Sequence, residues 1–484
     1  MALPIPPRRP ALIDGRPVEA GSTLPVRDPA TGTVIAEVAA CGPEEIDAAV
    51  AAARRCHRDE WRDTPAQRRA ALSRRLADLL RERAPLLAAA ETLDTGKPIS
   101  QARADVAAAA RYFDYYANTV EALFGETVLS RPDLLAYTVP EPHGVCGHII
   151  PWNYPLQVAA RTVSAALAAG NCCVLKPAED APLTPLLLGE LALEAGFPPG
   201  ALNVVPGHGT VAGAALASHP GIDHMSFTGS RETGRSVMAA AAANIVPVTL
   251  ELGGKSPHVV LADSDMERAV PQILGAIIEH AGQNCTAGSR VIAHESIRPQ
   301  LVERLAQSFR SLRIGPGLED PDLGPLISER QRQRVLGFLR RADRRADLVT
   351  GGGIPDRPGT GGGFFVEPTL YDCVPPGAEL AQEEIFGPVL CVTGFHELEE
   401  AVEIANGTAY GLGAAVWSGD ASTAQWLARE IRSGQVFINT YAIAGGVELP
   451  FGGMKASGFG VEKGFSALRQ YTRFKTVAVH TGAA

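Results

Sequence analysis

The stretch VCGHIIPWNYPLQVAARTVSAALAAGNCCVL, residues 145–175, has the pattern of a strand, a helix and a second strand. Short apolar runs at 145–150 and 171–175 predict the strands, and the amphipathic run at 156–169 predicts the helix between them. Because two strands joined by a helix usually lie parallel in one sheet, this stretch predicts an α/β fold.

The same alternation continues toward the C-terminus, and its βαβα order predicts a parallel sheet with helices on both faces. The further predicted elements up to residue 250 are 184–195, 202–205, 211–218, 225–227, 230–243 and 246–250. A second α/β stretch follows Glu251, with predicted elements at 259–261, 266–279, 290–293, 389–392, 414–417 and 436–438. A Gly/Pro-rich run at 351–363 predicts an exposed loop.

The N-terminal part is predicted to hold two helices, at 44–55 and after the Thr64-Pro65 pair, where a capping hydroxyl precedes a proline. The segment 121–142 breaks the alternation, because the strand pattern at 134–139 has no helix beside it. This segment is interpreted either as a hairpin arm that reaches a partner subunit or as a surface loop.

The composition is that of a globular protein, with 484 residues, 46% apolar and 20% charged. The net charge of −9 gives no support to a nucleic-acid partner. The eight cysteines have irregular spacing without zinc-ligand pairs, so no metal site is predicted and a reducing compartment is favoured. Since no apolar window reaches the ~20 residues of a membrane span and residues 1–9 lack a signal core, we expect a cytoplasmic protein without membrane contact.

Two residues stand out as candidates for chemistry. Cys285 lies among small and polar residues in GQNCTAG, so it is either an accessible nucleophile or an inert small side chain. Glu251 ends an apolar run and precedes two glycines. It is either a general base whose pKa is raised by burial or a solvated acid at the end of a strand.

Three other segments follow predicted strands, where α/β folds bind ligands. Asn153 in PWNYP is either an oxyanion donor or a helix cap. The runs FTGS, at 227–230, and Gly207-His-Gly209 are each weak signals for a phosphate site. Lys176 and Glu179 suit the hydroxyls of a ribose, and the glutamate disfavours NADP, but a surface ion pair is the alternative.

Taken together, seven motifs resemble the aldehyde dehydrogenase superfamily in order and spacing, in particular its betaine-aldehyde and semialdehyde members. The motifs are PWNYP, KPAE, FTGS, LELGGKSP, GQNCTAGSR, EEIFGPV and PFGGMKASGFG, which run from Pro151 to Gly460. The resemblance covers nearly the whole chain. It implies a Rossmann-like NAD-binding domain (1–120 and 143–253), an α/β catalytic domain (254–455) and a β-hairpin oligomerisation arm (121–142 and 465–484).

By this resemblance Cys285 is the nucleophile that forms a thiohemiacetal and then a thioester. Asn153 and the Cys285 backbone N–H hold the oxyanion, Glu251 activates the hydrolytic water, and Lys176 counts with the catalytic residues as well as with the cofactor contacts. The implied NAD contacts are Ile149, Ile150, Pro151, Trp152, Lys176, Glu179, Gly207, Phe227, Gly229, Ser230, Leu252, Gly253, Glu384 and Phe386. Glu462 matches a second family glutamate without an assigned role, and the arm implies a homodimer or homotetramer.

The implied substrate-binding residues are Tyr154, Arg161 and Phe451. Betaine-aldehyde-type members have a tryptophan where this chain has Arg161, which repels a cation and attracts a carboxylate. Semialdehyde-type members also have an arginine where this chain has Glu279, so the match to that group is incomplete. We therefore expect an ω-oxo acid or another polar aldehyde as substrate.

Two other functions compete with this one. The first is a coenzyme-A-acylating dehydrogenase, which the glutamate at 251 disfavours. The second is a structural relative without activity, which the joint presence of Cys285, Glu251 and Asn153 disfavours.

Overall fold

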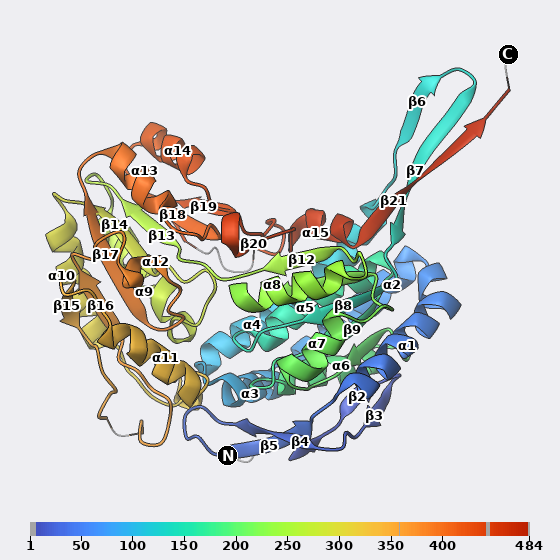
Figure 1. Ribbon diagram of the computed structural model, residues 1–484, viewed down its shortest axis with the longest axis horizontal. Coiled ribbons are helices and arrows are strands. Elements are labelled where there is room, and N and C mark those ends of the chain that lie inside the picture. The colour runs from blue at the N-terminus through green and yellow to red at the C-terminus, as the bar shows by residue number, and fades with distance from the viewer. Residues whose placement is uncertain (1–5, 358, 442–445, 483–484) are drawn as a thin grey trace.

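The computed structural model describes residues 6–357, 359–441 and 446–482, which form two large sheets and a projecting arm (Figure 1). The first large sheet has the strand order β20-β12-β11-β8-β9-β10-β2-β3. Its five central strands, from β12 to β10, run parallel, and the edge strands join antiparallel. The strands are β2 (Ala11–Ile13), β3 (Arg16–Val18), β8 (Val145–Ile149), β9 (Cys172–Lys176), β10 (Leu202–Val204), β11 (His224–Thr228), β12 (Val248–Glu251) and β20 (Gly458–Phe459).

Helices cover both faces of this sheet, because its central strands are apolar on both sides. Helices α1, α7 and α8 pack along one face, and α5 and α6 pack against the outer helices α2, α3 and α4 on the other (Figure 1). The helices are α1 (Pro43–Asp59), α2 (Ala66–Glu82), α3 (Ala84–Thr95), α4 (Ile99–Thr119), α5 (Pro155–Ala169), α6 (Leu183–Glu194), α7 (Ala214–Ala217) and α8 (Arg231–Ala242). Each has a buried apolar stripe, and α5 is buried at every position except Gln157.

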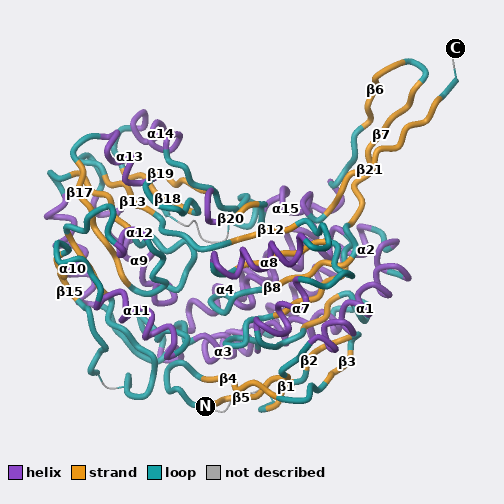
Figure 2. Tube along the Cα trace, viewed as in Figure 1, coloured by secondary structure: helices purple, strands orange, loops and turns teal. Residues whose placement is uncertain are grey.

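The second large sheet has the order β15-β16-β17-β14-β13-β18-β19 and is parallel except for β15. The strands are β13 (Pro257–Val260), β14 (Arg290–His294), β15 (Asp347–Thr350), β16 (Thr369–Asp372), β17 (Val389–Phe395), β18 (Gly413–Trp417) and β19 (Gln435–Ile438). The helices are α9 (Met266–Ile278), α10 (Arg298–Ser311), α11 (Glu329–Arg340), α12 (Glu379–Gln382), α13 (Leu398–Asn406) and α14 (Ala421–Glu430). Figure 2 shows the same alternation of strands and helices in both halves.

Two small sheets complete the fold. Near the N-terminus, β1 (Arg8–Arg9), β5 (Val34–Ala39) and β4 (Thr23–Arg27) pair in that order. The arm consists of β6 (Thr127–Arg131), β7 (Leu134–Pro142) and β21 (Thr472–His480), and it projects away from the body (Figure 1). The strand predicted at 134–139 is thus confirmed, and the surface-loop alternative is wrong.

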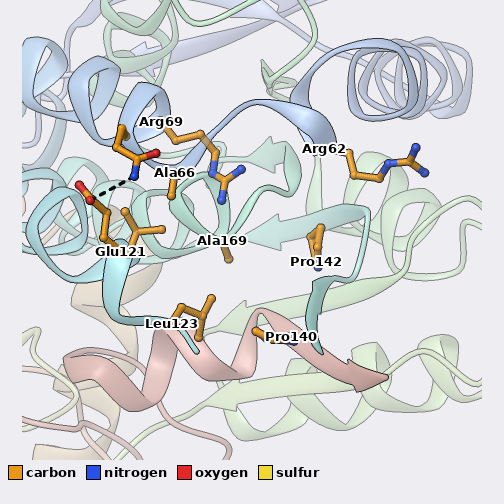
Figure 3. Close-up of a pocket in the computed structure, with 10 residues that line it drawn as sticks. Arg62, Ala66, Arg69, Glu121, Leu123, Pro140, Pro142 and Ala169 are labelled. Atoms are coloured by element: carbon orange, nitrogen blue, oxygen red, sulfur yellow. Dashed lines mark hydrogen bonds between the residues drawn. The ribbon is translucent and has the colours of Figure 1, made fainter. Parts of the chain in front are cut away.

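The arm leaves the body beside helix α2. A cavity of about 300 Å³ lies there, lined by Arg62, Arg69, Glu121, Pro140 and other residues (Figure 3). Among the described residues, no helix is both long enough and apolar enough to cross a membrane.

The predicted elements are confirmed with small shifts of their ends, apart from the helix predicted at 211–218. That segment begins as a π-helical turn, Gly209–Gly213, and continues as the short helix α7. The sequence patterns did not predict the N-terminal strands, helices α3 and α4, strands β15, β16 and β20, or helices α10 to α14 of the second half.

Candidate active site

A cleft of about 1950 Å³ is lined by residues from both large sheets. Four parallel strands of the first sheet contribute residues at or just beyond their carboxyl ends, namely Ile150, Lys176, Thr228 and Glu251. Ligands of open α/β sheets bind at such ends. The structure brings every predicted site residue to this cleft except Gly207.

Gly207 packs instead against the backbone near Cys41. A Cβ atom at this position would lie 2.6 Å from the Cys41 carbonyl oxygen, so the close approach of two backbones requires glycine there. The cleft is lined instead by Gly209 and Thr210. Gly207 thus has a packing role and does not line the cleft, and its predicted contact with the cofactor stays a prediction.

Cys285 follows a turn with unusual backbone angles. Helix α9 ends at Ile278, and His280 and Ala281 then have φ of 47° and 54°, in the left-handed region. Gly282 continues the turn with φ of 72°, and a Cβ atom there would lie 2.1 Å from the Gly387 carbonyl oxygen. This turn brings the half-buried Cys285 into the cleft.

Burial raises the pKa of the Cys285 thiol to about 12, because a thiolate is poorly solvated there. The positive charges of Arg161 and Lys463 act in the opposite direction, and the carboxylates of Glu384 and Glu251 add to the increase. These two cations therefore favour the thiolate, against the larger opposing effect of burial.

Asn153 lies in the loop between β8 and α5 and is buried. Its side-chain nitrogen donates to the backbone carbonyl of Gln283 at 2.8 Å, two residues before Cys285. The Gln283 side chain is fixed in turn, since it donates to the His280 carbonyl at 3.0 Å and accepts from the Ile327 N–H at 2.9 Å. An amide nitrogen carries two N–H groups, so Asn153 retains one for a further acceptor.

Glu251 ends strand β12 and is 1% exposed. Neither of its carboxylate oxygens has a hydrogen-bond partner among the described residues. Burial raises the pKa of Glu251 well above 4.5, the nearby Glu462 carboxylate raises it further, and Arg161 and Lys463 oppose the increase. A carboxyl group with a raised pKa is suited to accept a proton near neutral pH.

Glu462 forms a buried ion pair with Arg161, with 2.5 Å between Nε and Oε2. Glu462 also accepts a hydrogen bond from the Ser226 hydroxyl at 3.1 Å. The Glu462 carboxylate compensates the positive charge of Arg161. The expected recognition of a substrate carboxylate by Arg161 depends on that charge. Arg161 lines the cleft, but it offers no free positive charge.

Lys463 also lines the cleft and did not emerge from the sequence. Its ammonium nitrogen lies 4.7 Å from the centre of the Phe451 ring. Burial lowers the pKa of Lys463 to about 8, and the charge of Arg161 adds to this decrease. The one feature of the sequence that could have indicated Lys463 as a site residue is its position directly after Glu462, which was already matched to the family.

The opposite part of the cleft has groups suited to a dinucleotide. The ammonium of Lys176 lies 3.3 Å from a carboxylate oxygen of Glu179. Gly229 and Ser230 precede helix α8, where the Ser230 hydroxyl accepts from the Thr233 N–H at 3.2 Å. The N-terminus of a helix of this length favours a phosphate group.

Between these parts, Glu384 and Phe386 approach the loop after β12. Glu384 accepts from the Gly254 N–H at 3.0 Å, and a Cβ atom on Gly253 would lie 2.2 Å from the Glu384 carboxylate. The rings of Trp152 and Phe386 meet edge to face, with centres 5.3 Å apart. Gly253 thus leaves room for the Glu384 carboxylate, and a Cβ atom on Gly254 would lie 2.4 Å from the Cys285 carbonyl oxygen.

Tyr154 is the remaining predicted substrate contact. Its ring lies 4.2 Å from the ammonium of Lys97, which is buried with Glu91 and Asp105. Glu279 accepts from the Asn284 side chain at 3.3 Å, beside Cys285. Beside Tyr154, the buried charge of Lys97 is therefore compensated by the carboxylates of its own cluster.

The model of the aldehyde dehydrogenase family matches residues 17–477 of this chain. The chain belongs to the aldehyde dehydrogenase family. The mitochondrial aldehyde dehydrogenase of Homo sapiens is 43% identical over 464 residues, which cover 94% of this chain and 89% of that protein.

Solved structures agree with this assignment. An aldehyde dehydrogenase from Bacillus cereus, solved as an NAD+ complex, has a TM-score of 0.96 and 40% identity, with 100% of both chains covered. The betaine aldehyde dehydrogenase of Staphylococcus aureus, also in complex with NAD+, has a TM-score of 0.96 and 37% identity, with 98% of this chain and 95% of that chain covered. The predicted family, α/β fold class and enzyme class are confirmed.

Proposed function

We propose that this aldehyde dehydrogenase oxidises an aldehyde to the carboxylic acid with NAD, through covalent catalysis at Cys285. The observation that carries the proposal is the meeting of three separate motifs in one cleft. Cys285, Glu251 and Asn153 come from different segments of the chain, and all three line the cleft that also contains Lys176 and Glu179.

The residues of the cleft fit NAD. Lys176 and Glu179 offer a donor and acceptors for ribose hydroxyls, and the start of helix α8 at Ser230 offers N–H groups for the pyrophosphate. Glu384 and Phe386 also line the cleft and would hold the nicotinamide end. The NAD+ complexes of the related enzymes support the same cofactor, which accepts a hydride when bound.

The reaction begins at the sulfur of Cys285, which adds to the carbonyl carbon of the aldehyde as a thiolate. The new C–S bond leaves a negative charge on the substrate oxygen, and the Asn153 side chain and the Cys285 backbone N–H donate hydrogen bonds to it. Once the hydride has left the carbon, a thioester of Cys285 remains.

Glu251 then removes a proton from water, and the resulting hydroxide attacks the thioester carbon. The C–S bond breaks, the carboxylic acid leaves and the Cys285 thiolate is restored. In sum, aldehyde, NAD+ and water become carboxylate, NADH and two protons. Glu251, which is buried and has no hydrogen-bond partner within the described ranges, favours this hydrolysis over transfer of the acyl group to coenzyme A.

We also propose the division into a cofactor domain (1–120 and 143–253), a catalytic domain (254–455) and an oligomerisation arm (121–142 and 465–484). The arm is suited to a homodimer or homotetramer, because all of β6 is exposed and Leu129 in it is 86% exposed. All eight cysteines are free thiols, which supports a reducing, cytoplasmic location.

The test is the rate of NADH formation with a panel of neutral, anionic and cationic aldehydes, for the wild type and for Cys285→Ala. We expect the substitution to lower turnover by about 10⁴-fold or more while NAD binding, followed by tryptophan fluorescence, persists. Turnover that survives without Cys285, or a requirement for coenzyme A, would contradict the proposal.

A further inference from the structure

We propose that Lys463 selects the substrate, and that its ammonium group binds a carboxylate carried by the aldehyde. This inference rests on the proposed aldehyde oxidation and names the class of its substrate, an ω-oxo acid. Lys463 takes the role that the sequence suggested for Arg161.

The charges around the nucleophile single out Lys463. Two cations influence the Cys285 thiol, namely Arg161 and Lys463. Arg161 is committed to the buried carboxylate of Glu462. Lys463 forms no ion pair with any carboxylate in the described part of the chain. It therefore presents a positive charge to the cleft that a substrate anion can compensate.

The position of Lys463 is set by a rigid backbone. Glu462 and Phe451 exchange backbone hydrogen bonds of 2.6 Å, and the Gly464 N–H donates to the Val447 carbonyl at 2.7 Å. Between them, Lys463 has a φ of 63°, a left-handed conformation that side chains with a Cβ seldom adopt. Its surroundings thus hold the lysine at the wall of the cleft rather than at a mobile loop tip.

The ammonium of Lys463 lies beside an aromatic ring. The Phe451 ring lies 4.7 Å from the Lys463 nitrogen, and Phe437 and Leu449 line the same cleft. An ammonium held over apolar side chains is poorly solvated, so a carboxylate gains more there than it would in water. By the same charge, a trimethylammonium aldehyde is repelled, in contrast to the related betaine aldehyde dehydrogenase.

An alternative is that Lys463 acts through Glu251, whose pKa it lowers. A positioning role of this kind would change the hydrolysis of every thioester to the same degree. Recognition of a carboxylate would instead change the ratio between an anionic aldehyde and its neutral counterpart. The two roles are therefore separable by experiment.

The experiment compares kcat/KM for an ω-oxo acid and for its methyl ester, in the wild type, Lys463→Met, Lys463→Arg and the control Arg345→Met. Arg345 is an exposed residue paired with Asp343, so its loss removes one positive charge outside the cleft. We expect the wild type and the control to prefer the acid at least tenfold. The preference should collapse in Lys463→Met, mainly through KM, and persist in Lys463→Arg.

An unchanged ratio in Lys463→Met would overturn the inference, as would an equal loss for both substrates with a displaced pH profile. Titration calorimetry with glutarate, a dicarboxylate of the product type, provides a readout without turnover. Binding that weakens at least tenfold in Lys463→Met supports carboxylate recognition even if no aldehyde is oxidised, in which case only the proposed function fails. Equal binding by both proteins would contradict the inference.

Discussion

At the scale of single residues, the site balances two buried carboxylates against two cations. Glu251 and Glu462 both lie within reach of the charges of Arg161 and Lys463. Each carboxylate destabilises the other in its ionised form, and each cation offsets part of this cost. Of these four groups, only Arg161 and Glu462 form an ion pair with each other. The charges of Glu251 and Lys463 therefore remain available for chemistry and recognition.

The pH dependence of substrate preference tests the charge on Lys463. Burial lowers the pKa of this lysine to about 8, and the groups that face it are Arg161, Cys285, Glu462 and Glu251. An ammonium is charged below its pKa, so the preference for an ω-oxo acid is expected below about pH 8 and should fall as the pH rises through that value. The kcat/KM ratio of acid to ester, measured across this range, reports the change. In Lys463→Arg the ratio should hold to higher pH, and a wild-type ratio that does not vary with pH would contradict the prediction.

A second residue-scale prediction concerns Glu462→Gln. The change leaves the Arg161 guanidinium buried and uncompensated, which should lower the free energy of unfolding by about 3 kcal/mol, measured with urea. It also removes a negative charge near Glu251, so the pKa of Glu251 should fall and the acid limb of kcat should move to lower pH. The matched control is Glu82→Gln, which breaks an exposed pair with Arg75 and should cost at most about 1 kcal/mol. Equal stability of the two variants would contradict the account.

At the scale of elements, the site depends on how two loops are joined. The turn after α9 places the Gln283 carbonyl against Asn153 in the loop after β8. The Gln283 side chain holds that turn through His280 and Ile327. In the proposed mechanism, the oxyanion donor Asn153 is therefore oriented by Gln283, which does not itself line the cleft.

The substitution Gln283→Ala tests this arrangement. Loss of the two side-chain hydrogen bonds of Gln283 frees the turn, and the backbone carbonyl that holds Asn153 can then move. The resulting displacement of Asn153 should lower kcat by about 10- to 100-fold. Steady-state kinetics should show a smaller change in KM and unchanged binding of NAD. A kcat equal to that of the wild type would show that the anchor is dispensable.

Helices and strands with a regular apolar pattern can be predicted from the sequence. Those whose buried residues depend on distant partners cannot. Strands β8 to β12 are short apolar runs bounded by turns, so their positions were predicted with small shifts. Helix α4 is rich in alanine and buries Asp105 beside Lys97, which weakens its apolar stripe. The N-terminal strands have two to six residues each, too few for a periodic signal.

The site residues that belong to sequence motifs could be predicted. The ion pairs between residues that are distant in the sequence could not. Cys285, Glu251 and Asn153 follow from quoted motifs, and all three line the cleft. The compensation of Arg161 by Glu462 joins residues far apart in the chain, so only coordinates reveal it. Lys463 follows a Gly-rich run without periodicity, and its exposure to the cleft depends on its left-handed backbone.

At the scale of the whole molecule, the arm is a separate sheet that does not belong to either of the two large sheets. Its three strands pair with one another, and apolar side chains such as Leu129 and Phe474 are exposed on it, at 86% and 56%. Exposed apolar surface on a projecting sheet favours contact with a second copy of the chain.

Light scattering after size-exclusion chromatography tests this role. The wild type is expected to elute as a dimer or tetramer, and Leu129→Asp should shift it to a smaller species because the charge is unfavourable in an apolar interface. The control Ile354→Asp changes an exposed apolar residue outside the arm and should leave the mass unchanged. A monomeric wild type, or no shift in Leu129→Asp, would contradict the role of the arm.

The central claim is that Cys285 carries the acyl group and that Glu251 releases it. Intact-protein mass spectrometry of Glu251→Gln, quenched after mixing with NAD and an aldehyde, tests this most directly. We expect an adduct that maps to Cys285 and is lighter by two hydrogens than the aldehyde that was added, as a thioester requires. An unmodified protein that still releases acid, or an adduct on another residue, would contradict it.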